Sequence, residues 1–400
     1  MSWKRKLGND WGRLGMMSEW RTIRAADFID FNPRLNLKKG AITTKVAMDK
    51  LKPFTKKIPE TEKAEFNGGA KFCNGDTVMA RITPCLENGK TAYVDMLDDG
   101  EIGFGSTEFI VMRAKAGISD PQFVYYTAIN PTFRNVAIKS MVGSSGRQRV
   151  QQSVLEELEL SVPGLDEQRR IGAFLAELDE KIALNNKIND NLLAQAQTLY
   201  KQFFPYSVQD DLPDGWRIGT VGEIIEIHDS KRIPLSGADR AKMEKKIYPY
   251  YGAASLMDFV DNYIFDGKYL LLGEDGTVVD DAGYPILQYV WGQFWVNNHA
   301  HILTGRLGYD VESLYMLFKQ TPVKYIVTGA VQPKINQANL RSIQVVIPPE
   351  HTLREYNDLV EPLFSLFRAN EEECKTLTAL RDSLLPKLMS GELDVSAIQL

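Results

Sequence analysis

The sequence predicts an α+β chain in which two similar globular α/β domains are separated by two long helices that pair as an antiparallel coiled coil, with a pseudo-twofold internal repeat. Three observations predict this: the repeat itself, a heptad pattern in each copy, and short strand-like runs elsewhere. Residues 149–203 match residues 334–388 without a gap, at a separation of 185. A repeat this long indicates whole domains and not the short units of a solenoid.

The repeat sets the boundaries of the predicted segments. Trp20 matches Trp216 at the start of the two copies, and the offset then changes where surface loops can absorb insertions. The predicted segments are an N-terminal extension at 1–17, a first globular domain at 18–164, a first helix at 165–206, a second globular domain at 207–348, a second helix at 349–391 and a tail at 392–400.

Short runs of β-forming residues dominate both globular domains. Runs at 77–80 and 109–112 recur at 269–272 and 301–303, and Asn-Gly and Asp-Gly pairs mark the turns. One helical pattern in each copy adds helices to these strands, so the domains are predicted to be α+β.

Apolar residues recur at heptad spacing from Ile171 and again from Tyr356, which is typical of a coiled coil. Antiparallel pairing is favoured because each helix leaves its domain at one end and the chain must return from the other. Two amphipathic helices that dock separately on their own domains are the alternative. Pro386 is expected to end or kink the second helix. The residues predicted to set the register are Leu178, Asn185, Asn189, Leu363, Asn370 and Leu377.

Composition excludes several classes of protein. With 44% hydrophobic residues among 400, the chain can bury two cores. It has no apolar run of about 18 residues, so we do not expect it to span a membrane. Its three cysteines lack the spacing of zinc sites or of a disulfide framework, and this favours a reducing, cytoplasmic compartment.

The net charge of −5 is distributed unevenly. Residues 1–160 hold 24 Lys and Arg against 19 Asp and Glu, and segment 134–149 is basic without any acidic residue. A phosphate footprint needs such a local basic face. Two similar domains joined by stiff helices could therefore measure a distance on double-stranded DNA. Residues 171–203 would span about 50 Å, or about one to one and a half DNA turns.

No segment carries a convincing catalytic motif. The Asn-Pro pairs at 32–33 and 130–131 lack the remainder of an adenine methyltransferase loop, and Gly89-Lys90-Thr91 lacks the first glycine of a phosphate-binding loop. His299 and His301 have no evident third metal ligand, so hydrogen bonding is their expected role. We therefore expect neither catalytic nor metal-binding residues in this chain.

Four strings, taken in order and with their recurrence, point to a known family. They are 143–149 (GSSGRQR), 163–171 (PGLDEQRRI), 329–335 (GAVQPKI) and 385–393 (LPKLMSGEL). On these residues the chain resembles the specificity subunits of type I restriction–modification enzymes, over nearly all of residues 20–395. The resemblance implies two target recognition domains, one for each half of a split, asymmetric DNA site. Because residues 106–109 differ from residues 298–301, the two half-sites are expected to differ.

The resemblance also implies a subunit without catalytic activity. Its expected partners are double-stranded DNA, two methyltransferase (M) subunits and restriction (R) subunits. S-adenosylmethionine, ATP and Mg are expected on those partner subunits, and no cofactor is expected on this chain. The alternatives are an adaptor for a different methyltransferase or defence system and a coiled-coil scaffold with no DNA role.

The candidate DNA contacts lie in loops that combine glycines, small polar residues and cations, since Arg can read guanine, Gln can read adenine and both can reach phosphates. For each of them, a solvated turn is the alternative. The candidates in the first domain are Arg34, Arg81, Ser144, Ser145, Arg147, Gln148 and Arg149, and those in the second are Lys231, Arg232, Gln332, Lys334 and Asn336.

Overall fold

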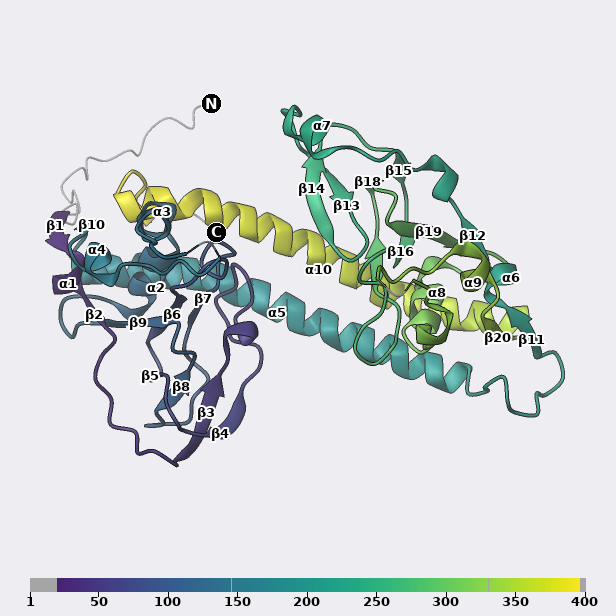
Figure 1. Cartoon of the computed structure of the whole chain (residues 1–400), viewed down its shortest axis with the longest axis horizontal. Helices are drawn as coiled ribbons and strands as arrows, with labels where there is room; N and C mark the ends of the chain where they lie inside the picture. The colour runs from purple at the N-terminus through teal and green to yellow at the C-terminus, as the bar shows by residue number, and fades with distance from the viewer. Residues whose placement is uncertain (1–19, 145, 330, 396–400) are drawn as a thin grey trace, which may run out of the picture. The chain divides into compact units, whose positions relative to one another are not determined.

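The computed structural model describes residues 20–144, 146–329 and 331–395 (Figure 1). The chain divides into two compact units, residues 1–186 with 371–400 and residues 187–370. Both boundaries fall within the long helices α5 (Leu165–Phe203) and α10 (Glu350–Ser390). Each unit therefore contains one globular domain and part of both helices. The predicted extension at 1–17 lies outside the described residues, as does the end of the predicted tail.

The globular domain of the first unit contains two four-stranded sheets, of order β2-β9-β6-β7 and β4-β3-β8-β5. Strand β1 pairs antiparallel with β10, which joins the start of the domain to its end. Its elements are β1 (Arg21–Arg24), α1 (Ala25–Phe28), β2 (Ile29–Phe31), β3 (Ile42–Val46), η1 (Met48–Lys50), β4 (Glu62–Glu65), β5 (Ala70–Phe72), β6 (Thr77–Ala80), β7 (Thr91–Tyr93), β8 (Gly103–Gly105), β9 (Phe109–Ala114), α2 (Pro121–Ile129), α3 (Pro131–Lys139), α4 (Gln152–Glu156) and β10 (Glu159–Val162).

The domain of the second unit repeats this topology strand for strand. Its sheets have the orders β12-β19-β16-β17 and β14-β13-β18-β15, and β11 pairs with β20. The elements are β11 (Arg217–Thr220), α6 (Val221–Ile224), β12 (Ile225–Ile227), η2 (Asp229–Lys231), α7 (Gly237–Ala241), β13 (Tyr248–Tyr251), β14 (Leu256–Val260), β15 (Phe265–Asp266), β16 (Tyr269–Gly273), β17 (Leu287–Val290), β18 (Gln293–Val296), β19 (Ala300–Gly305), α8 (Val311–Phe318), η3 (Lys324–Ile326), α9 (Gln337–Arg341) and β20 (Gln344–Ile347). The short η3 stands where the first domain has α3.

The repeat extends to single hydrogen bonds. Asn32 follows β2, where its Oδ1 accepts from a backbone N–H of β9 and its Nδ2 donates to Gln152 at 2.6 Å. Asp229 follows β12, where it accepts from a backbone N–H of β19 and, at 2.6 Å, from Gln337. Gln337 lies 185 residues after Gln152. Asn32 and Asp229 therefore connect the central strands β9 and β19 to the first residues of helices α4 and α9.

Helices α5 and α10 pair antiparallel, as predicted. In the first unit, Asp179 binds Arg381 at 2.6 Å and Asn185 donates to Glu373 at 2.6 Å. The partner's number falls as the number along α5 rises, which defines antiparallel strands. The second unit continues this order, since Asn189 meets Asn370 and Ala196 meets Tyr356.

Of the residues predicted to set the register, Asn185, Asn189 and Asn370 form hydrogen bonds between α5 and α10. Burial differs among the predicted residues: Leu178, Asn185, Asn189 and Asn370 are buried, whereas Leu363 and Leu377 are half-buried and pack against the cores. The side-chain amide of Asn370 donates to Asn189 at 2.9 Å. Because this buried amide is paired only in the observed register, it disfavours slipped ones.

Of the two outcomes expected at Pro386, an end or a kink, the end of the helix is contradicted, since α10 continues to Ser390. The same helix also contains Pro362. A proline inside a helix removes one hydrogen bond and costs about 3 kcal/mol. The neighbours Leu385 and Leu388 are fully buried, and we attribute the continuation of the helix to this packing.

Each unit has its own core. In the first, residues of the sheets and of α2, such as Phe123 and Tyr126, pack with Leu178 of α5 and Leu388 of α10. In the second, the strands pack with α8 and with Tyr356 of α10. Among the described residues, no helix combines the length and the apolar character needed to cross a membrane.

Candidate nucleic-acid interface

A glycine-containing hairpin holds most of the candidate contacts of the first domain. Val142 pairs with Arg149 across this hairpin, and Gly146 at its tip has φ +78°, a conformation that favours glycine. Ser144 and Arg147 are exposed at the tip, and Gln148 is half-buried. Ser145 lies outside the described residues. The predicted loop is therefore a hairpin in the structure, and its role in DNA contact stays a prediction.

The second domain has the equivalent hairpin, in which Thr328 pairs with Lys334 and Gly329 has φ +87°. The hydrogen bonds that attach both hairpins to the central sheet match one by one. Those of the first domain are Val150 N–H to Arg81 O and Thr83 N–H to Gln148 O; those of the second are Ile335 N–H to Glu274 O and Gly276 N–H to Pro333 O.

This match changes the alignment at one important position. The sequence match of 77–80 with 269–272, continued by one residue, places Arg81 opposite Gly273, whereas the hydrogen bonds place Arg81 opposite Glu274. The strand pairing shows the same shift along the whole strand, because Val78 pairs with Val111 as Leu271 pairs with the equivalent Ile302. The second copy therefore carries one additional residue at the start of β16, and a gap-free comparison along the strand cannot detect it. The hairpin of the first domain is therefore attached beside an arginine, and that of the second beside a glutamate.

Both hairpins carry an internal ion pair at their base. Arg149 binds Glu108 through two nitrogens, the shorter contact being 2.6 Å, and this hydrogen bonding lowers the pKa of the Glu108 carboxyl. Lys334 lies 3.2 Å from Glu274 and 3.3 Å from Asp275, and the hydrogen bond to Glu274 raises the pKa of its ammonium. Arg149 and Lys334 therefore have part of their charge compensated within the chain.

A hollow of about 580 Å³ opens beside the hairpin of the first domain. It is lined by three cations, Arg34, Lys71 and Arg81, together with Asn32 and Thr107. Arg34 is exposed, and it forms no ion pair with any residue in the described ranges; the same holds for Arg147. Lys71, Asn32 and Thr107 were missed by the sequence analysis because they come from separate loops that only the fold brings together.

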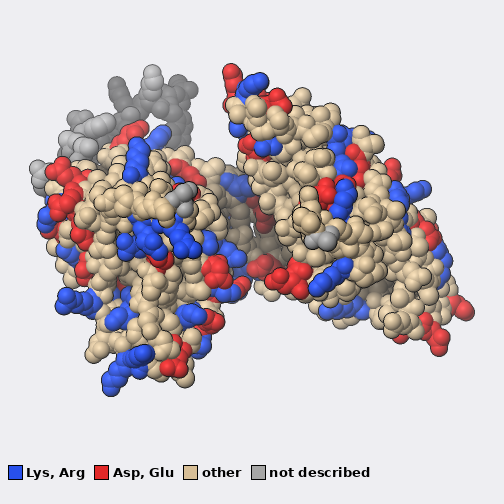
Figure 2. All heavy atoms as spheres, in the orientation of Figure 1, with Lys and Arg blue, Asp and Glu red and all other residues tan. Residues whose placement is uncertain are grey.

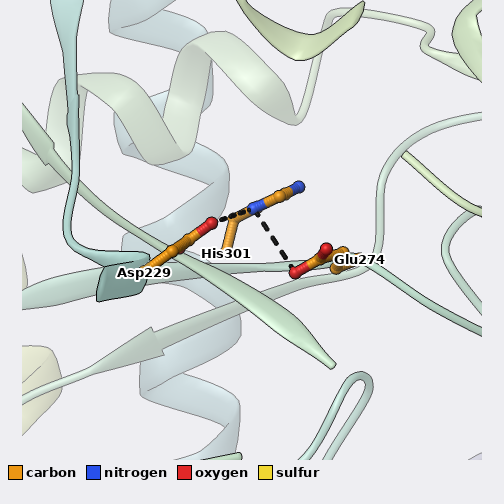
Figure 3. Close-up of side chains that lie close together, drawn as sticks. All are labelled: Asp229, Glu274 and His301. Carbon is orange, nitrogen blue, oxygen red and sulfur yellow. Dashed lines mark hydrogen bonds and ion pairs between the residues drawn. The ribbon is translucent and has the colours of Figure 1, made fainter. Parts of the chain in front are cut away.

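Arg232 of the second domain has its charge compensated by acids of the same chain, and its role in DNA contact stays a prediction. It is mostly buried, with Nη1 2.6 Å from Glu274 and Nη2 3.4 Å from Asp229 (Figure 3 shows these two acids). The fully buried His301 lies 2.6 Å from Asp229, and its Nε2 donates to the carbonyl of Ile335 at 2.8 Å. The interpretation of His301 as a hydrogen-bonding residue is confirmed.

Asp229, Glu274 and His301 also have the donor set of a metal site, with one ligand atom each within 4.8 Å of the others. The guanidinium of Arg232 already supplies the positive charge that these carboxylates need. Burial alone would raise the pKa of Asp229, but hydrogen bonding from His301 and the nearby charges lower it below its usual range. The cluster is therefore an internal ion-pair network that braces the hairpin.

The other candidates of the second domain have mixed surroundings. Lys231 and Gln332 are exposed, and Lys231 forms no ion pair with the residues that the structure describes. Asn336 caps helix α9, where its side chain accepts from the N–H of Asn339 at 2.8 Å. Its side-chain oxygen is thus engaged in holding the helix.

Positive side chains gather across the middle of the first domain on the face shown in Figure 2. This gathering of positive side chains agrees with the net charge of +5 of residues 1–160. The second domain pairs Arg232 and Lys334 with its own acids, and of its candidate cations Lys231 forms no ion pair with the described residues. The two domains thus share a fold but present different electrostatic surfaces.

The sequence matches the type I restriction modification DNA specificity domain twice, over residues 17–194 and 213–378. The chain belongs to this family, and it is a specificity subunit, the component of such systems that carries no catalytic activity. Its two recognition domains fit a bipartite site. Specificity subunits of this kind work with methyltransferase and restriction subunits.

Specificity subunits from other organisms are similar to this chain. The HindI specificity subunit of Haemophilus influenzae is 30% identical over 412 residues, which cover 80% of this chain and 86% of the relative. The MjaIX specificity subunit of Methanocaldococcus jannaschii is 24% identical over 309 residues, which cover 69% and 70%. The crystal structure of a type I S subunit from M. genitalium has a TM-score of 0.53 at 18% identity, covers 96% of this chain and 98% of its own, and shows the shared fold.

Proposed function

We propose that the chain binds double-stranded DNA through the two hairpins at 142–149 and 328–334, each reading one half of a split site. The observation that carries this proposal is the repetition of one hairpin, with the same backbone hydrogen bonds, beside the central sheet of both domains. Each hairpin presents exposed polar side chains, among them Arg147 in the first and Gln332 in the second. Arginine and glutamine are suited to reading guanine and adenine edges.

The two domains would contribute differently to affinity. The first offers Arg34 and Arg147, which lack acidic partners among the described residues, beside a hollow that contains Lys71 and Arg81. The second compensates Lys334 and Arg232 with Glu274 and neighbouring acids. Phosphate contacts dominate affinity and its salt dependence. The first domain should therefore supply most of the salt-dependent binding.

The proposal also includes the assembly of this chain with its partner subunits. Two M subunits and the R subunits would join this chain, and S-adenosylmethionine, ATP and Mg would bind to those partners. The net charge of −5 supports a division of labour, because a chain this acidic gains from partners that complete a basic surface around DNA.

Methylation mapping tests the proposal. The chain is expressed with the M subunits of its own system, and genomic methylation is sequenced. We expect one bipartite motif with two different halves, which disappears when this chain is omitted. Methylation at a continuous motif, methylation without any motif, or methylation that persists when the chain is omitted would contradict the proposal.

A salt titration with the assembled complex tests the contribution of single cations. Arg34→Ala and Arg147→Ala should weaken binding and each reduce the salt slope by about one, as expected for the loss of a phosphate contact. Lys334→Ala serves as the matched control, because its ammonium is already paired within the chain. Equal effects of all three substitutions would contradict the assigned asymmetry.

A further inference from the structure

A buried polar network ties the first recognition domain to both long helices. The Tyr126 hydroxyl of α2 donates to Asp179 of α5 at 2.6 Å, and the other oxygen of Asp179 accepts from Arg381 of α10 at 2.6 Å. Lys56, from the loop after η1, donates to the same hydroxyl at 3.2 Å. All four residues are at most 5% exposed. One carboxylate thus joins three elements of the unit.

The second unit has a network of the same kind, built from other residues. Glu312 of α8 is fully buried and accepts from Tyr289 of β17 at 2.6 Å. Arg368 of α10 contacts both, at 3.0 Å to Glu312 and 2.6 Å to the Tyr289 hydroxyl. Lys268 lies 2.7 Å from Glu312, and Lys268 and Arg368 both pair with Glu361 of α10.

These networks do not arise from the internal repeat. The position 185 residues after Asp179 is Phe364, and the position 185 residues before Arg368 is Ala183. Each domain therefore has its own tyrosine–carboxylate–arginine network, which reaches α5 and α10 in the first unit and α10 in the second. The recurrence of one chemical arrangement on different residues indicates a shared requirement at both junctions and not an inherited accident of sequence.

We propose that these two networks are positioning devices that hold each recognition domain in one orientation on the helix pair, and so restrict the complex to a single spacer length between the half-sites. The inference rests on the proposed reading of a bipartite site. The residues that carry it are Tyr126, Asp179 and Arg381 in the first unit and Tyr289, Glu312 and Arg368 in the second.

The physical argument is one of directionality. Apolar contacts tolerate sliding and rotation because the hydrophobic effect has no preferred direction. Hydrogen bonds between charged groups require short distances and narrow angles. A domain that rotated on its helices would separate Asp179 from the Tyr126 hydroxyl and Glu312 from Arg368. The loss of one donor from a buried carboxylate is unfavourable. An apolar junction would hold the domain equally firmly but would permit neighbouring orientations.

The test separates orientation from stability. In the first unit, Lys56→Met, Tyr126→Phe, Asp179→Leu and Arg381→Met are introduced together, because replacing a whole buried ion pair by apolar residues often preserves stability. The variant is assembled with its M subunits, and the spacer lengths of all methylated sites are mapped. We expect unchanged half-site bases and about a tenfold rise in sites whose spacer differs by one base pair, which corresponds to about 1.4 kcal/mol.

Arg354→Met is the matched control. It removes another arginine from α10, but the ion pair of Arg354 with Glu350 is exposed, so the spacer should stay unchanged. A Tyr289→Phe, Glu312→Leu and Arg368→Met variant tests the second unit in the same assay. A stable four-residue variant that keeps one spacer at wild-type frequency overturns the inference.

Two further outcomes have a defined meaning. If the four-residue variant fails to assemble, the single substitutions Tyr126→Phe and Asp179→Asn are mapped in its place. If both of these variants keep the single wild-type spacer, the inference is overturned. If the wild-type complex reads no bipartite site, the proposed function fails on its own, whatever the variants do.

Discussion

Removing one heptad from both long helices should shorten the spacer of the recognised site. The deletion takes out residues 182–188 of α5 and 371–377 of α10, seven from each. It preserves the Asn189–Asn370 contact and the Asp179–Arg381 pair, and it removes the Asn185–Glu373 contact. Because apolar residues recur every seven positions, the remaining layers stay in phase.

The magnitude follows from helix geometry. Seven residues at about 1.5 Å each shorten the pair by about 10 Å. With about 3.4 Å per base pair, this corresponds to about three base pairs if the helix axis runs along the DNA, and to fewer if it is inclined. Because DNA also twists by roughly 100° over three base pairs, methylation at the new spacer should be less efficient.

Methylome sequencing measures the spacer directly. The length-preserving control is Asn185→Ala with Cys374→Ala, which removes contacts from the same segment and should leave the spacer unchanged. A deletion variant that assembles and methylates sites with the original spacer would refute the idea that the helices set this distance.

Three other predictions concern single residues. Arg147→Ala should weaken DNA binding by the assembled complex and lower its salt slope by about one without affecting assembly; an unchanged titration removes this residue from the interface. Burial lowers the pKa of Lys56 to about 8, below its unfolded value, so the native state binds fewer protons between about pH 8 and 10.5. The free energy of unfolding of the wild type should therefore rise with pH through this window, by up to about 3 kcal/mol more than that of Lys56→Met. Urea unfolding at several pH values measures this difference, and parallel pH profiles of the two proteins would contradict the prediction. Leu178→Ala should destabilise the first unit by about 2–5 kcal/mol because it opens a cavity in the core; calorimetry showing less than about 1 kcal/mol would place Leu178 outside it.

The helix pair was predictable because its signal is local and periodic. A heptad repeat identifies the face that must be buried, and the internal repeat supplies a second helix of matching length. Antiparallel order followed from chain connectivity alone. The strand order within the domains was not predictable, because short strands of two to six residues carry no information about which neighbour they join.

The polar networks were missed for a different reason. Arg381 occupies a heptad core position, where an arginine suggests a break in the pattern, and its partner Asp179 lies far away in the sequence. Arg232 looked like a DNA contact because it follows Lys231 in a short basic pair, yet Glu274 and Asp229 enclose it. Single charged residues do not reveal their partners. The hairpins, in contrast, were recognisable from their glycines and from the repeat.

The last helix completes the core of the domain that is translated first. Leu385, Leu388 and Met389 are buried among residues of the first unit, and the ring of Trp20 lies close against Gly391. A nascent chain must therefore wait for nearly its whole length to leave the ribosome before that domain can bury its apolar surface. A premature stop codon near the 3′ end of the coding sequence would damage the amino-terminal half, although every residue of that half had been synthesised.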